Sequence, residues 1–274
     1  GVYYSKSNAL IFDHQTRQEF IDKGLSEKYI RSFWGSNEFI KGINRYCLWI
    51  DDEDLFEVEN FSFIKNIFNS VKQERLATKD KSVNKLAEKP HQFREKKGDK
   101  CSKIFVPIVS SESREYFPAG LVNKDIIATN KAFYVETSQL WPLAILVSKL
   151  HLTWISTVCG RLEMRLSYSN TLGWNTFPIP KLTEKNKADL TRCAENILLA
   201  REAHFPATIA DLYDPEKMPE NLRQAHEEND EVLERIYIGR RFKNDTERLE
   251  KLFSMYTEMT SKPNAAASRK TKGQ

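Results

Sequence analysis

Residues 141–169 read WPLAILVSKLHLTWISTVCGRLEMRLSYS and join two contrasting patterns. Residues 141–159 are apolar over most of their length, and Pro142 stands where the first turn of a helix accepts proline. Residues 161–169 then alternate strictly between polar and apolar side chains, as a strand with one buried face does. The stretch therefore predicts a buried helix followed by an amphipathic strand, the combination expected of an α/β domain.

The sequence on either side changes character near residues 178–180. Before that point, short runs rich in β-branched and aromatic residues predict strands, and apolar residues at helical spacing predict a helix around residues 63–71. The strand-like runs are 45–50, 104–109, 126–129 and 132–136. After that point, the apolar spacing is helical, and it predicts helices around 194–201, 222–236 and 249–256.

These patterns divide the chain into three regions. We expect residues 1–180 to form an α/β (α+β) domain with a mixed sheet and packed helices. Residues 181–260 should form a small all-α segment. Residues 261–274 have no hydrophobic pattern, and we expect a disordered tail there.

The composition is that of a folded protein with a sizeable core. The 274 residues are 40% hydrophobic and 11% aromatic, which excludes a disordered chain. Lys149 and His151 interrupt the longest apolar stretch, so no membrane span is expected. The chain has no signal peptide and starts at Gly1 rather than methionine, so we expect part of a longer protein. Its four cysteines lie more than 30 residues apart, which argues against a structural zinc site and a disulfide framework. A protein with free cysteines is expected in the reducing cytoplasm.

Positive charge is concentrated in one stretch, although the net charge of the chain is only +4. Residues 72–103 contain 11 basic and 5 acidic side chains, which favours a polyanionic partner; the other interpretation is a solvated surface loop. Residues 181–260 contain 13 basic and 17 acidic side chains. The two regions are therefore not expected to contact a polyanion equally.

The sequence lacks the common catalytic motifs. It contains no G-x-G-x-x-G, G-x-x-x-x-G-K-[ST], H-E-x-x-H or G-x-S-x-G pattern, and no N-P-P-Y or D-P-P-Y tetrapeptide. Asp80 with Glu95 and Lys97 satisfies a D…E-x-K nuclease pattern only formally, because these residues lie in a highly polar stretch rather than on buried strands. We therefore expect no catalytic residue, metal site or cofactor site in this chain, and a free-standing enzyme is disfavoured.

The polar face of the alternating segment is the strongest candidate binding surface. As an extended strand it would turn Leu162, Met164, Leu166 and Tyr168 to the core, and it would present Arg161, Glu163, Arg165, Ser167 and Ser169 on the other side. Arginine can bind guanine O6 and N7, and glutamate can accept from cytosine N4. The other interpretation is an ordinary strand with a salt-bridged solvent face.

Several blocks of sequence, in order, resemble the C-terminal part of the MmeI-like (type IIL) restriction–modification enzymes. These are single chains that fuse a nuclease, an adenine methyltransferase and a target recognition domain. The blocks are Ile30-Arg31, WGSNE at 34–38, RYCLWI at 45–50, VPIVSSE at 106–112 with Arg114 and Tyr116, SKLHLTW at 148–154, GRL at 160–162 with Tyr168-Ser169, NTFPIP at 175–180, LYD at 212–214, Met218-Pro219, Leu222 and Ala225-His226.

The resemblance implies that residues 1–180 are a DNA target recognition domain and that double-stranded DNA is the partner. It implies an upstream adenine methyltransferase domain of the same parent chain, with S-adenosylmethionine bound there, and the parent can also carry a nuclease. Glu163 and Arg165 fall at the family's base-reading positions. Ser167 stands where family members often have a second basic residue, so one phosphate contact is in doubt.

The sequence allows further DNA contacts and one other function. Ser110, Ser111 and Arg114 can form a phosphate-binding cluster or a purely structural turn. Basic residues of the 72–103 stretch are candidates for DNA backbone contacts, namely Arg94, Lys96, Lys97 and Lys100, and Arg161, Ser167 and Ser169 are candidates next to the base-reading pair. The alternative function is a degenerate protein-interaction module that only assembles a DNA-modification complex.

The basic stretch leads to a binding prediction. If residues 72–103 follow the DNA backbone, replacing Lys96, Lys97 and Lys100 by alanine weakens binding to all sequences alike. The slope of log affinity against log salt then falls by about 0.9 for each phosphate group that is no longer bound. Binding titrations at several salt concentrations measure this slope. An unchanged slope would return the segment to the solvated-loop interpretation.

Overall fold

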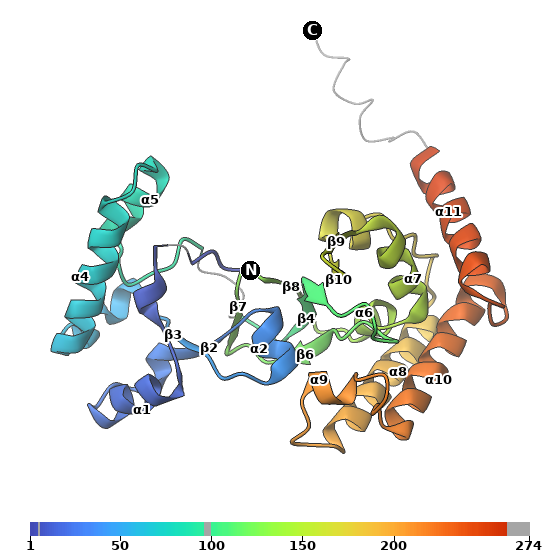
Figure 1. Ribbon diagram of the computed structural model, residues 1–274, viewed down its shortest axis with the longest axis horizontal. Helices are drawn as coiled ribbons and strands as arrows, with labels where there is room; N and C mark the ends of the chain where they lie inside the picture. Colours follow the sequence, from blue (N-terminus) through green and yellow to red (C-terminus); the bar gives the residue numbers. More distant parts are fainter. Residues whose placement is uncertain (5, 96–99, 262–274) are drawn as a thin grey trace, which may run out of the picture.

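The computed structural model describes residues 1–4, 6–95 and 100–261. Figure 1 shows an elongated molecule with an N-terminal lobe at one end, small sheets in the middle and a helical C-terminal part at the other end. The predicted α/β class with a mixed sheet, packed helices and a helical C-terminal segment is confirmed. In the described part of the chain, no helix is both long and apolar enough to cross a membrane.

The N-terminal lobe is built on a mixed four-stranded sheet in the order β1–β3–β2–β7. The strands are β1 (Ile11–Phe12), β2 (Ile30–Trp34), β3 (Tyr46–Leu48) and β7 (Ile126–Ala128). β2 pairs in parallel with β7, whereas β1–β3 and β2–β3 are antiparallel. Helices α1 (His14–Asp22), α3 (Leu55–Val58), α4 (Ser62–Leu76) and α5 (Lys81–Lys85) belong to this lobe. The parallel pair therefore joins two segments that are far apart in the sequence.

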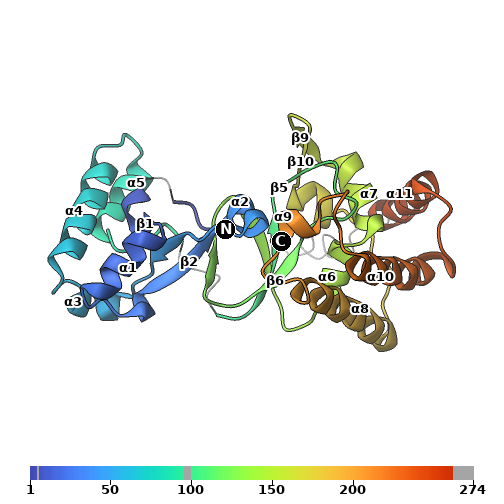
Figure 2. The ribbon, with the colours of Figure 1, turned by 60° about the horizontal axis from the view of Figure 1, so that its bottom comes forward.

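Two further sheets and one short helix make up the middle of the molecule. The first sheet has the order β6–β4–β8 and the second has the order β5–β10–β9, and all of their pairings are antiparallel. Their strands are β4 (Lys103–Pro107), β5 (Val109–Ser110), β6 (Gly120–Val122), β8 (Ala132–Glu136), β9 (Gly160–Leu162) and β10 (Arg165–Ser167). Helix α2 (Ser36–Lys41) follows β2 and lies beside them (Figure 2).

The C-terminal helices share one hydrophobic core with the sheets that precede them. This core runs from Ile104 on β4 to Leu252 near the end of the chain. The helices are α6 (Trp141–Leu146), α7 (Lys149–Val158), α8 (Glu184–Glu202), α9 (Ile209–Leu212), α10 (Glu220–Ile238) and α11 (Asp245–Ser261). A separate core fills the N-terminal lobe. The helical part is thus packed as a continuation of the α/β domain.

The predicted single helix over residues 141–159 is wrong, because the chain forms two helices there. Ser148 has an extended backbone, with φ −81° and ψ 158°, and its side chain accepts a hydrogen bond from the His151 amide. Asp230 of α10 accepts from the Lys149 amide at 2.8 Å. These two polar groups satisfy the N-terminus of a new helix inside an apolar run. His151 itself is a buried core histidine.

The C-terminal tail is only partly within the described residues. Ser261 falls in the segment for which the sequence predicts a disordered tail, but it is the last residue of α11. Residues 262–274 lie outside the described part of the chain, and the prediction for them stays a prediction.

Two cations of the basic stretch at 72–103 are buried and structural. Arg75 is fully buried and donates to the Ser7 hydroxyl and to the backbone carbonyls of four residues, namely Lys6 (3.3 Å), Leu86 (2.6 Å), Lys89 (2.9 Å) and Gln92 (2.6 Å). Lys103, also buried, donates to the Ile126 carbonyl at 2.7 Å. The charge of this stretch is therefore partly an internal feature of the fold, which a count along the sequence could not distinguish.

The burial of Arg75 leads to a stability prediction. Arg75→Met removes every hydrogen bond that the guanidinium donates. The Leu86 and Lys89 carbonyls keep one backbone N–H partner each, but the Gln92 carbonyl and the Ser7 hydroxyl lose the buried guanidinium, and a buried group left unsatisfied costs about 1–3 kcal/mol. We expect the free energy of unfolding to fall by at least about 3 kcal/mol, measured by urea denaturation. Arg192→Met on α8, where the arginine side chain is 65% exposed, is the matched control and should change little. Equal stability of the two variants would contradict the structural role of Arg75.

Candidate nucleic-acid interface

Residues 161–169 form a hairpin instead of the single strand that their alternation predicts. β9 and β10 pair antiparallel, with Arg161 opposite Leu166 and Leu162 opposite Arg165, and the chain reverses between them. Leu166 and Tyr168 are buried as predicted, but Leu162 and Met164 are 50% and 69% exposed. β9 is the edge strand of its sheet, and neither Leu162 on it nor Met164 in the turn belongs to the hydrophobic core that contains Leu166 and Tyr168.

The turn of this hairpin carries the two predicted base-reading residues. Glu163 has a φ of +57°, in the left-handed region that few residues other than glycine adopt. Arg165 Nη2 lies 2.7 Å from Glu163 Oε2, and both side chains are exposed. The expectation that they project side by side from one strand is therefore wrong, because the turn intervenes. They meet as an ion pair at the tip of the hairpin.

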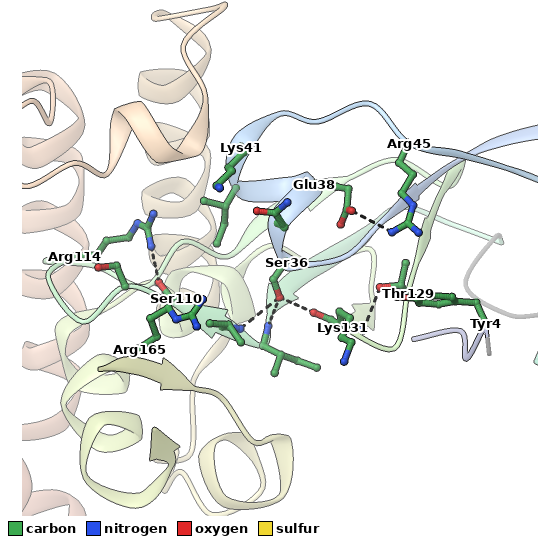
Figure 3. A pocket seen from close by; sticks show the side chains of 15 residues that line it. Tyr4, Ser36, Glu38, Lys41, Arg45, Ser110, Arg114, Thr129, Lys131 and Arg165 are labelled. Atoms are coloured by element: carbon green, nitrogen blue, oxygen red, sulfur yellow. Dashed lines mark hydrogen bonds and ion pairs between the residues drawn. The ribbon is translucent and has the colours of Figure 1, made fainter. Parts of the chain in front are cut away.

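A cleft of about 440 Å³ lies between α2 and the hairpin. Five basic side chains and one acidic side chain line it: Lys41, Arg45, Arg114, Lys131, Arg165 and Glu38. Figure 3 shows Arg114 and Arg165 at one end of this cleft and Arg45 and Tyr4 at the other, with Ser36 and Lys131 between them. Such an excess of positive charge suits a polyanion.

The Ser36 hydroxyl fixes the floor of the cleft. It donates to the Lys131 carbonyl at 2.5 Å and accepts from the Ile108 amide at 2.8 Å. Gly35 permits this close approach, because a Cβ atom there would lie 2.8 Å from Thr129 Oγ1 and 3.0 Å from Lys131 Cβ. The start of α2, the loop before β8 and the link between β4 and β5 are thus joined at one buried side chain.

The predicted cluster of Ser110, Ser111 and Arg114 exists and lines the cleft. Arg114 Nη1 donates to Ser110 Oγ at 3.2 Å, and burial lowers the pKa of the Arg114 guanidinium below its ordinary value. Among the described residues, Arg114 Nε has no hydrogen-bond partner and Arg114 has no ion pair. Ser111 Oγ shares a hydrogen bond with Ser113 Oγ at 2.8 Å. The positive charge of Arg114 is therefore not neutralised by an ion pair within the described residues, so the cluster can attract an anion.

The remaining predicted contacts are distributed differently. Arg161 lines a smaller pocket beside the Ser110 cluster, and Arg94 pairs with Glu95 at 3.6 Å in a separate pocket of the N-terminal lobe. Ser169 caps the π-helical turn Asn170–Trp174 by accepting from the Leu172 amide at 3.3 Å, and Ser167 is half-buried in β10. Lys100 is exposed, whereas Lys96 and Lys97 lie outside the described residues.

The sequence did not indicate most of the residues that line the cleft, among them Tyr4, Lys41, Arg45 and Lys131. Their clustering depends on the parallel pairing of β2 with β7, which brings residues near 36 beside residues near 130. No local pattern signals this pairing.

Within residues 1–4, 6–95 and 100–261, no group of three His, Cys, Asp or Glu side chains could hold a metal ion.

Comparison with known protein families defines the class as a target recognition domain followed by its C-terminal domain. Residues 1–181 match the target recognition domain of MmeI, and residues 182–263 match the MmeI C-terminal domain. The chain belongs to the MmeI family.

Two relatives show how much of a family protein the chain represents. DNA methyltransferase A of Bacillus subtilis (strain 168) is 39% identical over 234 residues, which cover 85% of this chain and 26% of that protein. The solved structure of the type IIL restriction-modification enzyme MmeI in complex with DNA superposes with a TM-score of 0.89 at 31% identity, over 95% of this chain and 35% of that chain. The chain therefore spans about a quarter to a third of these relatives.

The role of Ser36 can be tested by removing its hydroxyl. Ser36→Ala leaves the Ile108 amide without its acceptor, so the free energy of unfolding should fall by about 1–3 kcal/mol. Chemical denaturation measures the change, and Ser102→Ala at an exposed position is the control. If Ser36→Ala is as stable as Ser102→Ala, the hydroxyl does not hold the floor of the cleft.

Proposed function

We propose that this chain is the sequence-specific double-stranded DNA recognition module of a type II restriction–modification DNA methyltransferase that modifies adenine at N6. The observation that carries the proposal is the position of the hairpin: its charged tip stands beside a cleft lined by cations. Membership of the MmeI family supports it, as does the likeness to a family enzyme solved in complex with DNA.

The chemistry of the hairpin suits the edges of a G·C pair. A two-stranded β-ribbon fits the major groove of B-form DNA, where arginine can bind guanine O6 and N7 and a carboxylate can accept from cytosine N4. Glu163 and Arg165 already lie within 2.7 Å of each other, so both can reach one base pair. In this proposal the Ser110–Arg114 cluster binds a phosphate group nearby.

The catalytic part of the proposal lies outside this chain. An upstream domain of the same parent chain would bind S-adenosylmethionine and methylate an adenine that is flipped out of the duplex. The relation to DNA methyltransferase A supports this arrangement, since that protein is much longer than the present chain. The parent would act in the cytoplasm, where bacterial DNA lies.

The proposal is tested at the hairpin. Glu163→Lys combined with Arg165→Asp keeps an opposite-charge pair but reverses its direction, so guanine should move to the other strand at one position of the recognised sequence. Alanine at either residue should relax that position, because a good bidentate contact discriminates by about 1–3 kcal/mol. Sequencing of methylated sites made by the parent enzyme gives the result, and Arg192→Ala is the control.

Two outcomes would contradict the proposal in different ways. An unchanged site in both hairpin variants would show that Glu163 and Arg165 are structural. A chain that shows no salt-dependent binding to duplex DNA would instead favour the protein-interaction module, since a reader that contacts phosphates loses affinity steeply as salt rises.

A further inference from the structure

The side of the cleft that faces the hairpin is formed by α2 and by the turn that leads from α2 to β3. Lys41 is the last residue of α2, and Gly42 ends the helix with a φ of +64°. The chain reverses there and returns through Arg45 into β3 (Tyr46–Leu48). The reversal places Lys41 and Arg45 on the same cleft, and Figure 3 shows Arg45 at the end away from Arg114 and Arg165, with Lys41 between Arg45 and Arg114.

Arg45 is held in place while most of its donors stay available. Its Nη1 lies 3.3 Å from Glu38 Oε1, and the other oxygen of Glu38 accepts from the Gly35 amide at 2.8 Å. The Arg45 guanidinium also lies 5.6 Å from the centre of the Tyr4 ring. A guanidinium has five N–H donors, so the single bond to Glu38 leaves capacity for an anion.

The cleft as a whole has more positive charge than its own residues neutralise. Among the described residues, Glu38 is the one acidic residue that lines the cleft, and it pairs with Arg45. Lys41 and Lys131 are exposed and, in the described part of the chain, neither forms an ion pair. An isolated ion pair on the surface contributes little to stability, and an unpaired lysine contributes less. The stability of the fold therefore does not account for so many cations along one cleft.

We propose that Lys41 and Arg45 bind phosphate groups of the DNA backbone, so that the backbone is bound on the α2 side of the cleft while base edges are bound at the hairpin. This inference rests on the proposed function. The hairpin then distinguishes bases, and the α2 side of the cleft fixes the position of the duplex without regard to sequence. A row of cations suits this partner because duplex DNA carries about one charge per 1.7 Å of its axis.

The test uses the 274-residue chain and a 30-base-pair duplex of arbitrary sequence. Lys41→Gln combined with Arg45→Gln should reduce the slope of log affinity against log salt by about 0.9 for each residue. Lys185→Gln combined with Arg192→Gln removes the same charge from α8 and should leave the slope unchanged. Arg45→Lys retains the cation and should retain the slope, which separates loss of charge from loss of fold.

A selection from a random duplex library separates this inference from the proposed function. The Lys41/Arg45 double variant should select the same sequence as the unmodified chain, whereas Glu163 and Arg165 variants should select a different one. An unchanged salt slope in the Lys41/Arg45 variant, or a slope reduced equally in the α8 control, overturns the phosphate contacts and leaves base reading intact. Salt-dependent binding without any selected sequence overturns the proposed function instead. Failure of the unmodified chain to bind duplex DNA at low salt overturns both.

Discussion

The Ser36 hydroxyl is the contact on which the shape of the cleft depends. It donates to the Lys131 carbonyl and accepts from the Ile108 amide, so it joins the start of α2 to both of the smaller sheets. The parallel pairing of β2 with β7 delivers Ser36 to this place. Because buried polar groups must be paired, the positions of the three segments are coupled, and the charged residues that they carry are coupled with them.

The C-terminal helices also help to hold the sheets around the cleft in position. Buried Arg201 of α8 donates through Nη1 to the Ala119 carbonyl at 2.8 Å and through Nε to the Tyr213 hydroxyl at 2.8 Å. That hydroxyl in turn shares a hydrogen bond of 2.7 Å with His226 of α10. Gly120 makes room for this guanidinium, because a Cβ atom there would lie 3.1 Å from Arg201 Nη1. The helical part thus supports the sheets that bear the cleft.

The hairpin combines features that fold stability alone does not favour. Glu163 adopts a left-handed backbone, and Leu162 and Met164 leave apolar surface in solvent. Residues in sparsely populated backbone regions cost about 1–3 kcal/mol and often occur where a surface serves binding. The Glu163–Arg165 pair is exposed and so adds little stability. These features agree with a segment whose shape serves recognition, as proposed above.

The sequence by itself determined the fold class and the longer helices α4, α8, α10 and α11, because burial imposes a period on apolar residues that is visible locally. It did not indicate α1, α2, β1, β2 or β6. β8 (Ala132–Glu136) begins and ends where its run of residues predicts. The charged residues of the hairpin could also be named from the sequence. Alternation could not reveal the turn at Glu163, since a hairpin with an exposed edge strand and a single strand share that pattern. The break at Ser148 depends on Asp230, which is 82 residues away in the chain.

Only the tertiary structure decided which cations belong together. Arg75 stands in a charged stretch of the sequence and Arg45 begins an apolar run, yet Arg75 is buried among carbonyls and Arg45 lines the cleft. Whether a charge faces carbonyls or solvent depends on segments brought together by long-range pairing, above all β2 with β7. Residue types and local spacing do not indicate that pairing. The residues on the hairpin side of the cleft could therefore be predicted from the sequence, whereas those on the α2 side could not.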